Sequence, residues 1–224
     1  MAVVTVDFDG TLYRGNSFKA MFQVAKREFT VKDWFIVGQG LVRSVVLGVL
    51  KGKQALRHTF FKSFAKSFKD KTEEELEQFF QSLVLEGIAE VHHELISKIR
   101  QHQLNGDQVV VLSGALHPFL QAFIKELNLD VHVISTELLF DDKGFCTGEI
   151  GTIVNGKEKV RRIVDWLGQN PAAANGANGS LEELWAYADS EHDLPLLEFV
   201  NQPIVVNPND DMLQIAKEKN WPIF

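Results

Sequence analysis

The sequence predicts an α/β protein whose doubly wound, mostly parallel sheet is interrupted after its first strand by an all-helical insert. Three observations support this prediction. An apolar, β-branched run at residues 2–7 opens the chain, residues 16–104 show helical periodicity with no clear strand, and strands and helices alternate from residue 105 onward. We therefore expect an α/β core of residues 1–15 and 105–224 and a helical unit of residues 16–104.

The first predicted strand ends on two acids. Its residues Val3 to Val6 are typical of a buried central strand, and Gly10 lets the chain turn away sharply. Asp7 and Asp9 therefore lie at the carboxyl end of a strand, where open α/β sheets place their active sites. Two carboxylates this close repel each other unless a cation or a shared proton lies between them.

The insert combines an apolar stretch with a basic one. Residues 34–50 are apolar but are interrupted by Gln39, Arg43 and Ser44, so we do not expect a membrane span. The following residues carry many lysines, with phenylalanines at helical spacing: Phe60, Phe61, Phe64 and Phe68. A basic, aromatic helix can lie on an anionic membrane surface and receive a lipid phosphate. We favour the alternative, that the phenylalanines pack the insert and the lysines face water.

The remaining elements follow from apolar periodicity and turn residues. Within the insert, residues 73–85 and 88–99 are predicted helices. After a turn at residues 105–107, the predicted elements are strand 108–112, helix 117–127, strand 131–134, a hairpin of 137–140 with 145–150, helix 157–167, strands 184–188 and 203–206, and helix 212–219. Residues 169–180 have low complexity and are predicted to form a solvated loop.

Two later segments carry groups that suit a phosphate. Ser113 and Gly114 directly follow a predicted strand, where a hydroxyl and free backbone N–H groups can hold an anion; a helix N-cap is the structural alternative. Lys157 and Lys159 open a helix, and a lysine there can neutralise a phosphoryl group. The residues alone leave open which lysine takes that role.

The last motif places further acids after a strand. Asp189 directly follows the predicted strand 184–188, and Asp193 comes four residues later with Pro195 behind it. Oxygen ligands of this kind suit Mg²⁺, which prefers a few carboxylates and several waters. A helix N-cap is the alternative for either acid taken alone.

Composition excludes several classes of protein. The net charge of −7 argues against a nucleic-acid partner. The single cysteine, Cys146, excludes an internal disulfide and a multi-thiolate zinc site, which fits a reducing cytoplasm. The N-terminal residues form a predicted strand and do not have the pattern of a signal peptide, so we expect a cytoplasmic protein.

Four segments in this order resemble the motifs of the haloacid dehalogenase superfamily of hydrolases, most of which are phosphatases. They are D-F-D-G-T-L, V-V-V-L-S-G, N-G-K-E-K-V and Y-A-D-S-E-H-D-L-P. The segment V-N-P-N-D-D near the C-terminus is similar to subfamily IB, the phosphoserine phosphatase-like group. That resemblance implies a Rossmann-like core with a helical cap between the first two motifs, in agreement with the insert at 16–104.

The resemblance also implies site roles. Asp7 would be the nucleophile that forms an aspartyl-phosphate, and Asp9 the general acid and then the base. Mg²⁺ would be held by Asp7, the Asp9 backbone carbonyl and Asp189, with Asp193 supporting it. The phosphoryl oxygens would be bound by Thr11, Ser113, Gly114 and Lys159. The family pattern favours Lys159 over Lys157 because Lys159 directly precedes a valine.

The predicted function is a Mg²⁺-dependent phosphomonoester hydrolase, monomeric or homodimeric, acting on a small-molecule phosphate. Phosphoserine itself is not favoured, because no acid lies between Tyr13 and Glu28 to read its ammonium group. The alternatives are a phosphotransferase, which shares the aspartyl-phosphate, and a lipid-phosphate phosphatase. A non-catalytic phosphate-binding regulator is less favoured because every catalytic carboxylate is present.

Overall fold

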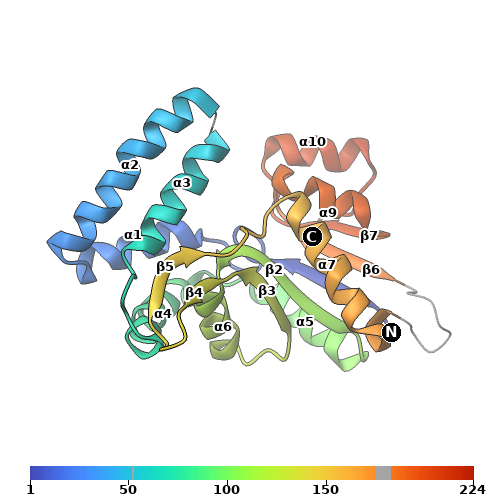
Figure 1. Ribbon diagram of the computed structural model, residues 1–224. Coiled ribbons are helices and arrows are strands. Elements are labelled where there is room, and N and C mark those ends of the chain that lie inside the picture. The colour runs from blue at the N-terminus through green and yellow to red at the C-terminus, as the bar shows by residue number, and fades with distance from the viewer. Residues whose placement is uncertain (52, 175–182) are drawn as a thin grey trace.

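A five-stranded parallel sheet forms the centre of the molecule (Figure 1). The computed structural model describes residues 1–51, 53–174 and 183–224. The strand order is β3-β2-β1-β6-β7, with bounds β1 Val3–Asp7, β2 Gln108–Leu116, β3 His132–Thr136, β6 Leu184–Ala188 and β7 Gln202–Val205. All four strand pairs are parallel, which confirms the predicted doubly wound α/β class.

Helices cover both faces of this sheet. Alternate side chains of a strand point to opposite faces, so Val4 and Val6 join one apolar core while Val3 joins the other. The first core includes α1 (Ser17–Glu28), α4 (Glu73–Gly87), α5 (His93–Leu104) and α6 (His117–Glu126). The second includes α7 (Lys157–Gln169), α8 (Pro171–Ala174), α9 (Leu194–Phe199) and α10 (Asp210–Glu218). Two buried cores therefore hold the strands in place.

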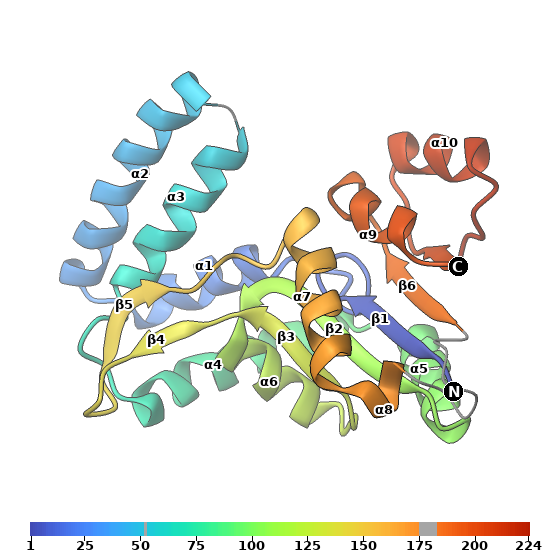
Figure 2. The same cartoon turned by 45° about the vertical axis from the view of Figure 1, so that its right-hand side comes forward.

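The helical hairpin of α2 (Val31–Lys51) and α3 (Lys53–Lys66) projects from the body of the molecule (Figures 1 and 2). Phe64 and Phe68 are fully buried and lie in an aromatic cluster with Phe29, Phe79 and Phe80. This packing is the structural role that we favoured for the phenylalanine stripe. The side chains of Leu41, of residues 43–58 and of Phe60 lie outside the described part of the chain.

The antiparallel hairpin of β4 (Leu138–Phe140) and β5 (Cys146–Ile150) forms where the sequence predicts it. β5 contacts α3, and a Cβ at Gly148 would come within 3.2 Å of the Lys66 Cα. The hairpin therefore joins the core to the helical insert. Among the described helices, none combines the length and apolarity needed to cross a bilayer.

Three local predictions were wrong. β2 extends to Leu116 through pairing with β3, so Ser113 and Gly114 lie inside the strand rather than in a turn after it. Residues 88–99 do not form one helix, because Val91 pairs with Tyr13 and separates the 3₁₀ turn η1 (Ile88–Glu90) from α5. The predicted loop 169–180 begins inside α7 and α8, and residues 175–182 lie outside the described structure.

α5 lies at the end of the predicted insert but packs on the sheet. Its residues Leu95 and Ile99 are fully buried in the first core, and His102 Nε2 lies 3.0 Å from the hydroxyl of Tyr187 on β6. The helix begins where His92 Nδ1 accepts a hydrogen bond from the Leu95 N–H at 3.3 Å. The division of the chain at residue 104 stays a prediction.

Candidate active site

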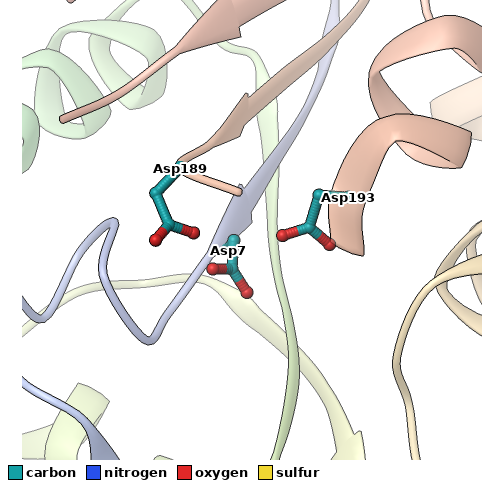
Figure 3. Close-up of side chains that lie close together, drawn as sticks. All are labelled: Asp7, Asp189 and Asp193. Carbon is teal, nitrogen blue, oxygen red and sulfur yellow. The ribbon is translucent and has the colours of Figure 1, made fainter. Parts of the chain in front are cut away.

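Three aspartates meet at the carboxyl ends of β1 and β6 (Figure 3). Asp7 is the last residue of β1, Asp189 directly follows β6, and Asp193 closes the 3₁₀ turn η2 (Glu191–Asp193) before α9. One carboxylate oxygen from each lies within 4.8 Å of the others. The chain runs outward from β1 to β2 and β3 on one side and places β6 and β7 on the other. Such switch points are where open α/β sheets bind ligands.

Lys159 from α7 joins these acids. Its Nζ lies 2.5 Å from Asp7 Oδ1 and 2.6 Å from Asp193 Oδ1, and the side chain is only 2% exposed. Lys157, which the residue types alone could not separate from it, is exposed. The helix therefore brings Lys159 and not Lys157 to the acids. One ammonium group faces three carboxylates.

The excess of negative charge changes the proton affinity of these groups. Burial raises the pKa of Asp7, the carboxylates of Asp193 and Asp189 add to the rise, and Lys159 opposes it. Burial and Asp193 raise the pKa of Asp189 to about 6. Burial alone would lower the pKa of Lys159, but Asp193 and Asp7 outweigh it and raise that pKa. The cluster is short of positive charge.

The donor set fits a divalent cation such as Mg²⁺. The three side chains offer only carboxylate oxygens, the ligands that Mg²⁺ prefers. Asp193 Oδ1 is buried, and its close contact is with the Lys159 ammonium group at 2.6 Å, which it shares with Asp7. Three carboxylates thus depend on a single positive charge. A cation bound among these oxygens would supply the missing charge.

Gly10 shapes the same place from the loop after β1. Its φ of +83° lies in the left-handed region, and an added Cβ would come 2.1 Å from Asp189 Oδ2. The loop is also held internally, since the Gly10 N–H donates to the Tyr13 carbonyl at 2.7 Å. A glycine is therefore required for the chain to pass this close to Asp189.

The other residues of the first motif surround Asp7. Thr11 is fully buried, and its Oγ1 donates to Asp7 Oδ2 at 3.2 Å. Asp9 points to α1, where its Oδ1 accepts from the Ser17 N–H and its Oδ2 from the Ser17 Oγ, both at 2.6 Å. Sequence reasoning did not identify Ser17. The available signal was its place directly after Asn16, which caps α1 and leaves the serine hydroxyl unused for capping.

Ser113 and Gly114 lie one and two residues beyond the level of Asp7 on the neighbouring strand, because Asp7 pairs with Leu112. The Ser113 hydroxyl is buried and accepts from the Ala115 N–H at 3.1 Å, so it is not a helix cap. The Gly114 carbonyl accepts from Thr136 Oγ1 at 2.9 Å. The structure places both residues at the correct edge of the sheet, and their role toward phosphate stays a prediction.

A separate cavity of about 1760 Å³ lies along β3 and α6. Its lining includes His117, His132 and Glu137 but none of the three aspartates or Lys159. The large cavity and the charged cluster are therefore different places.

Comparisons with known proteins agree with this geometry. A family model described as haloacid dehalogenase-like hydrolase matches residues 4–198. A histidinol-phosphatase of Neisseria meningitidis serogroup C is 30% identical over 153 residues, which cover 62% of this chain and 67% of that protein. The chain spans between 44% and 51% of the next curated relatives.

Solved structures share the fold. A protein of unknown function from Bordetella pertussis Tohama I has a TM-score of 0.78 at 23% identity, with 100% of this chain and 97% of that chain covered. A probable phosphoserine phosphatase from Vibrio cholerae has a TM-score of 0.65 at 16% identity, with 95% and 58% covered. At these identities the likeness establishes the fold alone.

Proposed function

The chain belongs to the haloacid dehalogenase-like hydrolase family, among relatives named as phosphatases, and from this premise we propose that it is a Mg²⁺-dependent phosphomonoester hydrolase. The substrate would be a small-molecule phosphate ester, and the reaction would pass through an aspartyl-phosphate on Asp7. One observation carries the proposal. The last residue of β1, Asp7, shares a buried site with two further acids and with the ammonium group of Lys159.

The residues that would hold Mg²⁺ are Asp7, Asp189 and the Asp9 backbone carbonyl, with Asp193 supporting them. When bound, the cation would neutralise charge on the phosphoryl oxygens and so reduce their repulsion with Asp7. Lys159 would supply a second positive charge. Its ammonium group orients Asp7 Oδ1 at 2.5 Å and can also bind a phosphoryl oxygen.

In the first half of the reaction, an Asp7 carboxylate oxygen attacks phosphorus and forms a new P–O bond. The bond from phosphorus to the ester oxygen breaks, and its electron pair leaves with that oxygen. Asp9 donates a proton to the leaving oxygen, so the alcohol departs neutral. Thr11, Ser113, Gly114 and Lys159 would bind the phosphoryl oxygens during the transfer.

In the second half, Asp9 is a carboxylate and takes a proton from water. The water oxygen attacks phosphorus, the bond between phosphorus and the Asp7 oxygen breaks, and inorganic phosphate leaves. Asp7 is then regenerated as a carboxylate and Asp9 as an acid. The two acids therefore need different surroundings, and Asp7 beside Lys159 differs from Asp9 beside Ser17 in this respect.

The relatives suggest which esters to test first. One is named as a histidinol-phosphatase and another as a phosphoserine phosphatase, and both names denote phosphate esters whose alcohol carries an amino group. We place histidinol phosphate before phosphoserine, because the relative named for histidinol phosphate is 30% identical to this chain and the one named for phosphoserine is 24% identical. The predicted cap of residues 16–104 would contact the part of the substrate that leaves as the alcohol. The predicted location of the protein is the cytoplasm.

The test is phosphate release from p-nitrophenyl phosphate and from a panel of metabolite and lipid phosphates, with Mg²⁺ and with EDTA. We expect turnover that requires Mg²⁺ and is abolished by Asp7→Asn. Asp142→Asn is the matched control, because Asp142 is exposed in the turn between β4 and β5. Turnover that survives Asp7→Asn would contradict the assignment of the nucleophile.

The same assay separates hydrolysis from transfer. With an added acceptor alcohol, a hydrolase releases inorganic phosphate in an amount equal to the alcohol released from the substrate. A phosphotransferase instead forms a new phosphate ester of the acceptor. The proposed function is wrong if the new ester is the main product, or if no phosphate ester in the panel is turned over.

A further inference from the structure

Ser17 is the first residue of α1 and makes two short hydrogen bonds to one carboxylate. Its backbone N–H donates to Asp9 Oδ1 and its hydroxyl donates to Asp9 Oδ2, both at 2.6 Å. Two donors from one residue on two different oxygens fix the plane in which the carboxyl group lies. We propose that Ser17 is a positioning residue that orients Asp9 for proton transfer to and from the substrate. This inference rests on the proposed function of the site.

The helix start makes Ser17 available for this task. The first N–H groups of an α-helix have no partner within the helix. Asn16 is the N-cap of α1, and its Oδ1 accepts from the Lys19 N–H at 3.1 Å, so the Ser17 N–H is left for Asp9. The start of a helix also favours a negative charge beside it. Both effects stabilise the Asp9 carboxylate in this position.

Among the described residues, those that line the small cavity beside Ser17 offer its hydroxyl no polar side chain. Ser17 borders a cavity of about 10 Å³, which is at the lower limit for a single water molecule. The other side chains that line this cavity are apolar: Met21, Phe61, Leu83, Leu116 and Phe119. The Ser17 hydroxyl is therefore directed to Asp9.

The two donors differ in a way that suits an acid that must also act as a base. A backbone N–H can only donate, so Asp9 Oδ1 stays an acceptor throughout the reaction. A hydroxyl can donate or accept, so the Ser17 Oγ can remain bonded to Asp9 Oδ2 in both protonation states. Ser17 therefore contacts both carboxylate oxygens of Asp9 and can hold the direction of the carboxyl group while its proton is given up and regained.

Ser17 also links this orientation to the helical insert. α1 buries Ala20, Met21, Val24 and Ala25 in the first core and contacts α4. On the other side, Asp9 is fixed by its own loop, where it forms a backbone bridge with Tyr13. The direction of the Asp9 carboxyl group therefore depends on where α1 starts.

The experiment uses substrates that differ in their need for an acid. Ethyl phosphate has a poor leaving group and requires proton donation, whereas p-nitrophenyl phosphate releases a stable phenolate. We expect Ser17→Ala to lower kcat/KM for ethyl phosphate by about 10- to 100-fold and for p-nitrophenyl phosphate by less than about threefold. We compare kcat/KM because this parameter covers the steps up to departure of the alcohol. Slow hydrolysis of the aspartyl-phosphate therefore does not hide an effect on proton donation to the leaving group.

Two further variants separate positioning from a structural role. Ser17→Thr keeps the hydroxyl and should restore the activity toward ethyl phosphate. In the Asp9→Asn background, Ser17→Ala should cause little further loss, because the residue acts through Asp9. Ser97→Ala is the matched control, since that hydroxyl bonds to a helix carbonyl on the exposed face of α5.

The outcomes are distinct. Equal losses on both substrates, no rescue by threonine, or additive losses in the double variant would overturn the role of Ser17 while leaving the proposed function intact. If the wild-type protein turns over neither these two esters nor any phosphate ester of the panel, the proposed function fails, and this inference fails with it. Thermal unfolding of each variant shows whether it folds, and Ser17→Thr provides the comparison if Ser17→Ala does not.

Discussion

Replacing Lys159 by methionine tests the charge balance of the site. Methionine keeps most of the side-chain volume but removes the ammonium group that lies 2.5 Å from Asp7 and 2.6 Å from Asp193. Removing one partner from a buried ion pair costs about 3–5 kcal/mol in free energy of unfolding. Lys159 is 2% exposed, so solvent does not screen the loss. Against a total stability of about 5–15 kcal/mol, a loss of this size is readily measured by unfolding.

The assay is urea unfolding followed by circular dichroism, in EDTA and in excess Mg²⁺. We expect Lys159→Met to lose about 3–5 kcal/mol in EDTA. A free Mg²⁺ concentration of one hundred times the dissociation constant should raise the free energy of unfolding by about 2.7 kcal/mol, because Mg²⁺ binds the folded state. Lys157→Met on the same helix is the control and should change stability by less than about 0.5 kcal/mol. The reasoning is refuted if both variants behave alike, or if Mg²⁺ stabilises neither the variant nor the wild type.

Three further predictions follow from the described geometry. The pKa of Asp189 is raised to about 6 from an ordinary 3.8, so the folded state holds this proton more tightly than the unfolded state does. The free energy of unfolding of the metal-free protein should therefore fall by roughly 2–3 kcal/mol as pH rises from about 4 to about 6. Asp189→Asn should flatten this change in urea titrations made in EDTA, and an unchanged slope would count against it. Burial and then Arg14 lower the pKa of His92, and neutral His92 caps α5, so stability should fall as pH drops below about 6.5. His92→Asn should weaken that dependence, as measured by thermal unfolding at pH values on either side. Gly10→Ala should cost more stability than Gly106→Ala, by at least about 1 kcal/mol, and should also remove activity. Both glycines have φ near +80°, but only at Gly10 would the Cβ meet Asp189.

The acids of the site could be predicted because they follow strands whose composition is unmistakable. The apolar run of Val3 to Val6 leads to Asp7, and the apolar residues 184–188 lead to Asp189. Because β1 and β6 are neighbouring parallel strands, their carboxyl ends lie at the same edge of the sheet. The choice of Lys159 over Lys157 came from the family pattern. Helical periodicity alone cannot say which of two residues on one turn faces the sheet.

Other features depend on tertiary contacts that local patterns do not contain. β2 continues past Leu112 because β3 pairs with it, and the residue types at 113–116 do not predict this pairing. α5 starts late because Val91 pairs with Tyr13, a residue almost eighty positions earlier in the chain. The Ser17–Asp9 contact likewise depends on where α1 starts relative to the loop after β1. Such pairings are fixed by packing, which periodicity does not encode.

The most direct test of the account is to identify the residue that carries phosphate during turnover. The protein is mixed with p-nitrophenyl phosphate and Mg²⁺, quenched in acid, digested and examined by mass spectrometry. The account predicts one phosphoryl group on the peptide that contains Asp7, absent from Asp7→Asn and from protein incubated without substrate. A phosphoryl group on a different residue, or turnover with no phosphorylated peptide in a quench fast enough to precede hydrolysis, would contradict it.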